Sequence, residues 1–179
     1  MLARGVGGTS LDDIRAGTST SKSQLFHYFP GGKSELIGAI ASFQADRVLA
    51  AQEPYLSRLA SWEDWQNWRD AVVRHYGSQP HWGCPIGALA GELTGTDSRR
   101  AAEVSAYMER WRGYLRAGIA RMIEAGEMRA GADAESLSLS VFASLQGGLL
   151  LIQTMESIEP LEAALDGALA LLRAEANGH

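Results

Sequence analysis

The chain has 179 residues, of which 46% are hydrophobic and 21% charged, with a formal net charge of −5 and an isoelectric point near 5.4. This length can bury one substantial core and support a small additional domain. One cysteine excludes an internal disulfide and fits a reducing cytoplasm, while no apolar run is judged long enough for a membrane span and no secretion signal is expected.

The first segment, residues 9–36, predicts two short helices joined by a tight turn. A hydroxyl at Ser10 can cap the first helix, and Asp13 can interact with its positive end. Residues 17–20 interrupt this helix, and Ser21 can cap the second one. The apolar side chains expected on the inner faces are Leu11, Ile14, Leu25, Phe26 and Phe29. This pattern is typical of a helix-turn-helix.

Polar and cationic residues gather on the outer side of the second helix, as a major groove and its phosphates require. The predicted DNA contacts are Thr20, Lys22, Ser23, Gln24, His27, Tyr28 and Lys33. We expect Gln24 to read a base edge, because an amide can pair bidentately with adenine, and Tyr28 and Lys33 to contact phosphates. No acidic residue lies between Asp13 and Glu35, so the local field is positive although the whole chain is acidic.

Beyond the head, the hydrophobic pattern predicts helices almost throughout and no strand. The expected helices cover residues 34–53, 61–76, 86–93, 97–125, 134–155 and 161–175, with a loop at 77–85 and Pro160 between the last two. The predicted fold is therefore all-α. It comprises a helix-turn-helix head in residues 1–45 and a helical body in residues 46–179.

The last two predicted helices, residues 134–155 and 161–175, are apolar over more of their circumference than one core face requires. This excess predicts an interface with a second copy of the chain, and the alternative is a hairpin buried within a monomer. Gly148→Trp or Leu165→Glu is expected to give monomers that keep their helices but lose DNA binding.

Aromatic side chains recur along residues 61–76 at Trp62, Trp65 and Trp68. Such a stripe is more often core than ligand site, but five tryptophans are many for a short helical body, and small-molecule cavities are mostly apolar and aromatic. The residues predicted to line an effector cavity are Trp68, Tyr107, Trp111, Phe142 and Gln146. Gln146 is either a polar anchor for the effector or a hydrogen-bonding partner of a neighbouring helix.

Other chemistry has little support in the sequence. The glycine-rich residues 5–10 lack the lysine and the strand of a phosphate-binding loop. His75, His81 and Cys84 lack a fourth metal ligand, and no nucleophile is paired with a base. We therefore expect no enzymatic activity, no cofactor and no metal.

The residues of the head resemble the motif of the TetR family of transcriptional regulators. The matching positions are Ile14, Ser21, Lys22, Leu25, Phe26, Tyr28, Phe29, Lys33 and Leu36. Residues 21–33 and 83–89 are similar, more narrowly, to the LmrA/YxaF branch. The resemblance implies a cytoplasmic homodimeric repressor that binds a double-stranded DNA operator and is released by a small hydrophobic or aromatic effector. Residues 46–179 are then expected to form its effector-binding and dimerisation domain, and residues 1–45 an incomplete helix-turn-helix head. The alternative is a helical small-molecule binding protein with a vestigial DNA-binding head.

The sequence departs from the family pattern at two places. The family usually has a glycine in the turn where this chain has Ser19, so the turn geometry can differ. Residues 1–5 look like only the last turn of the family's first helix. We therefore expect the first helix to be truncated and the head to be loosened.

Overall fold

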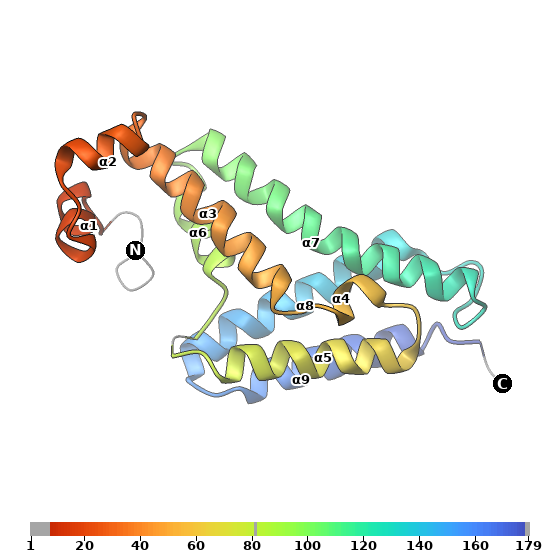
Figure 1. The fold of residues 1–179 in the computed structure, drawn as a ribbon. Helices are drawn as coiled ribbons and strands as arrows, with labels where there is room; N and C mark the ends of the chain where they lie inside the picture. Colours follow the sequence, from red (N-terminus) through yellow and green to blue (C-terminus); the bar gives the residue numbers. More distant parts are fainter. Residues whose placement is uncertain (1–7, 81, 178–179) are drawn as a thin grey trace. The chain divides into compact units, whose positions relative to one another are not determined.

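The structure, a computed structural model, describes residues 8–80 and 82–177, and this part of the chain is built from helices (Figure 1). They are α1 (Leu11–Thr18), α2 (Lys22–Tyr28), α3 (Gly32–Ala50), α4 (Tyr55–Arg58), α5 (Trp62–Gly77), α6 (Pro85–Leu93), α7 (Ser98–Glu124), α8 (Ala134–Met155) and α9 (Glu159–Arg173). Strand-like pairing among the described residues is limited to an isolated bridge between Met128 and Ala176. The all-α prediction is confirmed, while the predicted remnant of an earlier helix at residues 1–5 lies outside the described residues.

Helix boundaries differ from the predictions by a few residues, and two of these differences have a structural meaning. The long helix after the head ends at Ala50 rather than near residue 53, and the short α4 follows it. Pro160 does not separate the last two helices but lies in the first turn of α9. A proline fits there because the first backbone N–H groups of a helix need no partner within the helix.

The described chain divides into two compact units, and each is considered by itself. The first unit comprises Met1–Arg47 and Pro85–Met108, and the second comprises Val48–Cys84 and Glu109–His179. α3 and α7 therefore each contribute to both units. The predicted boundary at residue 45 lies close to the first change of unit, but α6 and the start of α7 group with the head. The limits of the functional domains stay a prediction.

Within the first unit, polar side chains connect α3 to the start of α7. The Ser34 hydroxyl donates to Asp97 at 3.0 Å and accepts from Nε of Arg100 at 3.1 Å. A Cβ atom at Gly38 would overlap the Arg100 guanidinium. Glycine at this position therefore leaves the space that the guanidinium occupies. Leu36, two residues after Ser34, is buried. Apolar packing therefore also holds α3 in the first unit.

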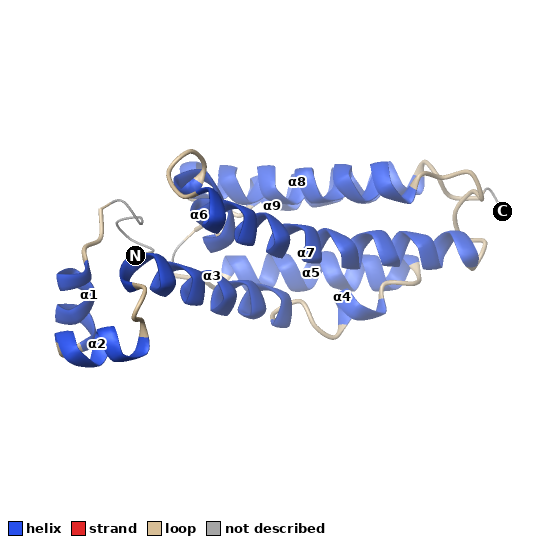
Figure 2. Ribbon diagram, turned by 90° about the horizontal axis from the view of Figure 1, so that it is seen from above, coloured by secondary structure: helices blue, strands red, loops and turns tan. Residues whose placement is uncertain are grey.

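Within the second unit, α9 contacts both α8 and α5, and the three run side by side (Figures 1 and 2). Gly148 on α8 allows a close approach, because a Cβ atom there would lie 3.0 Å from both Cα of Leu161 and Cβ of Ala164. Arg69 on α5 forms an ion pair with Asp166 on α9 at 2.8 Å.

The composition of α8 corrects one expectation from the sequence. α8 has 22 residues and a mean hydropathy of 1.4. Judged by length and composition alone, it could therefore cross a membrane. The expectation that no run reaches this length was therefore wrong. Leu145, Leu149 and Ile152 are nevertheless buried within the unit, as in the core helix of a soluble protein.

Candidate nucleic-acid interface

The first helix of the head begins and ends on local signals. The Ser10 hydroxyl accepts from the backbone N–H of Asp13 at 3.1 Å, and the Asp13 carboxylate accepts from the backbone N–H of Ser10 at 2.8 Å. This reciprocal pair is a capping box. At the other end, Ser19 has φ 54° and ψ 29° and donates its N–H to the carbonyl of Arg15. Ser19 therefore takes the left-handed conformation that glycine adopts most easily, and the turn is kept without the glycine.

A second capping box begins α2. The Ser21 hydroxyl accepts from the backbone N–H of Gln24 at 3.1 Å, and Oε1 of Gln24 accepts from the backbone N–H of Ser21 at 3.0 Å. Leu25 is buried and Phe29 half-buried, as expected of the inner face. The expectation for Phe26 was wrong, because its side chain is 41% exposed. With only seven residues, α2 has room for few inward positions.

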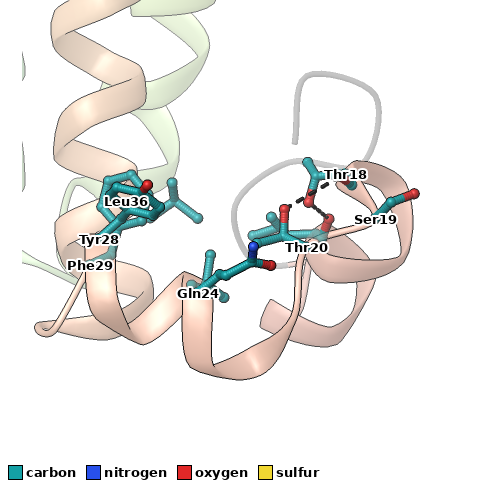
Figure 3. A pocket seen from close by; sticks show the side chains of 9 residues that line it. Thr18, Ser19, Thr20, Gln24, Tyr28, Phe29 and Leu36 are labelled. Carbon is teal, nitrogen blue, oxygen red and sulfur yellow. Dashed lines mark hydrogen bonds between the residues drawn. The ribbon is translucent and has the colours of Figure 1, made fainter.

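A hollow of about 450 Å³ opens beside α2 within the first unit (Figure 3). Tyr28, Phe29 and Leu36 lie on one side of it and Thr18, Ser19 and Thr20 on the other, with Gln24 between them (Figure 3). The remaining lining residues are Ile14 and Leu25. The hollow therefore brings together three of the predicted DNA contacts, Thr20, Gln24 and Tyr28, with apolar residues of the inner faces.

The other predicted DNA contacts lie outside this hollow. Lys22, Ser23 and His27 are exposed on α2, and Lys33 is half-buried in the first turn of α3. Tyr28 is 71% exposed, and its ring meets the His27 ring edge-on with centroids 5.3 Å apart. The outer face of α2 is thus accessible along its length and carries hydrogen-bonding groups, which is what groove contact requires.

Fewer residues contribute to the positive charge of the head than the sequence suggests. Arg15 is bound to Asp12 on its own helix at 2.7 Å, so its charge is largely balanced. The exposed side of α2 therefore owes its cationic character to Lys22, and Lys33 adds a second cation at the start of α3. Both cations belong to the residues predicted to contact DNA.

In the second unit, a buried glutamine organises the predicted effector residues. Oε1 of Gln52 accepts from the indole N–H groups of Trp68 at 2.8 Å and Trp111 at 3.1 Å. Its Nε2 donates to the carbonyl of Val48 at 2.8 Å. The Trp111 ring meets the Phe142 ring edge-on at 5.4 Å. Gln52 was missed in the sequence, where the only signal was an amide near the end of the helix expected at residues 34–53.

The two remaining predicted effector residues are placed differently. Gln146 lies one turn after Phe142 on α8, and its Nε2 is buried with no hydrogen-bond partner among the described residues. Its predicted bond to a neighbouring helix is therefore not made through this atom. Tyr107 is half-buried on the part of α7 that belongs to the first unit, whereas the other four residues belong to the second.

The residues considered for a metal site form no such site in the described part of the chain. No group of three or more histidine, cysteine or acidic side chains is gathered there, and His81 lies outside the described residues. Cys84 is buried beside Tyr76. Burial raises the pKa of the Tyr76 phenol well above its ordinary value, and the adjacent Cys84 adds to this effect.

Known proteins are similar to this chain over most of its length. Residues 56–168 match the family model described as the C-terminal domain of tetracyclin repressor-like proteins. An uncharacterized HTH-type transcriptional regulator of Lactococcus lactis subsp. lactis, encoded in the lacX 3′ region, is 25% identical over 170 residues, which cover 91% of this chain and 82% of that protein.

Solved structures of other proteins resemble this chain over both of its units. A TetR transcriptional regulator from Chloroflexus aurantiacus J-10-FL has a TM-score of 0.82 and 27% identity, covering 97% of this chain and 88% of its own. A TetR-family regulator from Cytophaga hutchinsonii has a TM-score of 0.78 at 19% identity, covering 98% and 88%, and shows the shared fold alone.

Proposed function

Since the chain belongs to the TetR family of DNA-binding transcriptional regulators, we propose that it is a cytoplasmic homodimeric repressor that a small hydrophobic effector releases from its operator. The accessible face of α2 is the observation that supports DNA binding. Lys22, Ser23 and His27 are exposed there, while Leu25 on the opposite side is buried. The assignment to the LmrA/YxaF branch stays a prediction.

Two copies of α2 are needed for useful specificity. α2 has seven residues, so a single copy reaches few base pairs. A two-fold pair of such helices reads half-sites whose centres lie about 10–10.5 base pairs apart, or a multiple of this distance. The expected operator is therefore an inverted repeat.

The surface proposed to join the two copies lies on α8 and α9 within the second unit. Its large apolar residues are exposed: Leu139, Leu150, Leu151, Met155 and Leu171. A Cβ atom at Gly147 or Gly167 would have no neighbour within 4 Å, so both glycines leave space on the exposed side of their helices. Together, these exposed residues support a bundle formed by α8 and α9 of two copies.

The packing of α8 on α9 changes which variants test this interface. Leu165 is fully buried, and Gly148 lies against Leu161 and Ala164 of the same chain. Gly148→Trp and Leu165→Glu therefore disrupt the fold of the chain itself. Leu150→Glu is the sharper change, because Leu150 is 61% exposed and contributes little to the core of its own chain.

The proposed effector is a flat, mainly apolar compound that binds near Trp68, Trp111, Phe142 and Gln146. The aromatic rings supply the apolar surface, and the unpartnered Nε2 of Gln146 supplies a donor for an acceptor group on the compound. A compound that prefers one conformation of the body by about 1–3 kcal/mol changes DNA affinity roughly 5- to 150-fold. A contribution from Tyr107 stays a prediction.

A selection experiment tests the proposed function. The purified chain is mixed with random DNA duplexes, and bound sequences are recovered and amplified over several rounds. We expect an inverted repeat to be enriched, and Leu150→Glu to sediment as a monomer and to lose this DNA. A protein that enriches no sequence, yet shows saturable quenching of its tryptophan fluorescence by aromatic compounds, would instead be a small-molecule binding protein.

A further inference from the structure

The oxygen of the Gln24 side-chain amide takes part in a cap, and its nitrogen does not. Its Oε1 accepts from the backbone N–H of Ser21 at 3.0 Å, which is half of the capping box that begins α2. The residue is exposed at the third position of the helix. Nε2 takes no part in this cap, and it can only donate.

The neighbouring hydroxyls also take part in local hydrogen bonds. The Thr20 hydroxyl, which lies next to Gln24 in the hollow, donates to the carbonyl of Thr18 at 3.4 Å (Figure 3). The Ser21 hydroxyl already accepts the backbone N–H of Gln24. Among the groups of the capping box that begins α2, Nε2 of Gln24 is thus the one that takes no part in the cap.

A donor alone distinguishes bases differently from a complete amide. Bidentate pairing with adenine needs an oxygen that accepts from N6 as well as a nitrogen that donates to N7. Guanine presents two adjacent acceptors, N7 and O6, and thymine presents O4, whereas cytosine presents only a donor. Reading adenine would require Oε1 to accept a second hydrogen bond while it holds the Ser21 N–H, whereas a keto base needs only Nε2.

Given the DNA-binding function proposed above, we infer that Gln24 reads a keto base, guanine in preference to thymine, through Nε2 while Oε1 stays in the capping box. This replaces the bidentate adenine contact expected from the sequence. The specificity of the head at this position is then determined by the cap of its own helix.

Gln24→Glu provides a matched test of this inference. Glutamate also serves at the third position of a capping box, so the cap is kept while the outward group changes from a donor to an acceptor. We expect its thermal midpoint to match that of the wild-type chain. In the selection from random duplexes, the wild-type chain should enrich guanine or thymine at one position of each half-site. Adenine there should weaken binding about tenfold.

The Gln24→Glu chain should enrich cytosine at the same position, because a carboxylate accepts from N4, and should keep the rest of the half-site. Wild-type enrichment of adenine, or an unchanged preference in the variant, would overturn the inference while leaving DNA binding intact. If the variant binds too weakly for selection, the wild-type preference decides by itself. If the wild-type chain enriches no sequence, the proposed function fails and this inference fails with it.

Discussion

Gln52→Leu is the most demanding test of how the body is held together. Gln52 is 1% exposed, and its Oε1 is the shared acceptor for two buried indole N–H groups. Leucine has a similar size but no acceptor. The substitution therefore leaves the N–H groups of Trp68 and Trp111 buried without partners, and it also removes the donor to the carbonyl of Val48.

The expected loss follows from the number of groups left unpaired. Each buried donor without a partner costs about 1–3 kcal/mol, so two of them cost about 2–6 kcal/mol. This is a large part of the roughly 5–15 kcal/mol that stabilises a typical domain. The aromatic contact between Trp111 and Phe142 should also loosen, because Trp111 loses the bond that orients its ring.

Urea unfolding followed by tryptophan fluorescence measures this loss, because all five tryptophans belong to the second unit. Gln66→Leu is the matched control, since Gln66 is half-buried in the same unit and its bond to Asp70 is long, at 3.4 Å. The control should stay within about 0.5 kcal/mol of the wild-type chain, as most substitutions away from buried polar networks do. A Gln52→Leu chain equally close to the wild type would refute the reasoning.

Three further substitutions have defined outcomes. Ser19→Gly should stabilise the head by about 1 kcal/mol in thermal unfolding followed by circular dichroism, because glycine relieves the left-handed backbone; a lower midpoint would contradict this. Gln146→Leu should leave unfolding by urea unchanged or shift it upward, because it removes a buried donor without a partner, but should weaken quenching by aromatic compounds. Hydrogen bonds from Arg116 and Arg112 lower the pKa of Glu135 from its ordinary value of 4.5. This stabilisation is fully present above the ordinary pKa and is lost as pH falls through the lowered one, so Glu135→Gln should lose less stability than the wild-type chain between roughly pH 5 and pH 3. Equal losses would show that the carboxylate contributes nothing.

The sequence predicted the features that depend on neighbouring residues. The caps at Ser10 and Ser21, the buried Leu25 and the succession of helices all follow from side chains within one or two turns of each other. Such signals are readable because helix periodicity and capping involve residues three or four positions apart.

The features that the sequence did not reveal depend on chemistry or packing that no local pattern records. Gln52 meets tryptophans 16 and 59 positions away, so only the packed body brings them together. Gln24 was predicted to pair with adenine through both amide atoms, but the sequence did not indicate that its oxygen also accepts from the Ser21 N–H. Phe26 was expected inside, although a seven-residue helix offers too few inward positions.

The salt dependence of operator binding tests the central claim most directly. The logarithm of affinity should fall with the logarithm of salt concentration, with a slope of about −0.9 for each phosphate contact. Lys33→Ala in a two-fold dimer removes two contacts and should reduce the size of this slope by about 1.8, while Arg58→Ala in the second unit should leave it unchanged. A Lys33→Ala slope equal to that of the wild-type chain would contradict a DNA interface formed by α2 and the start of α3.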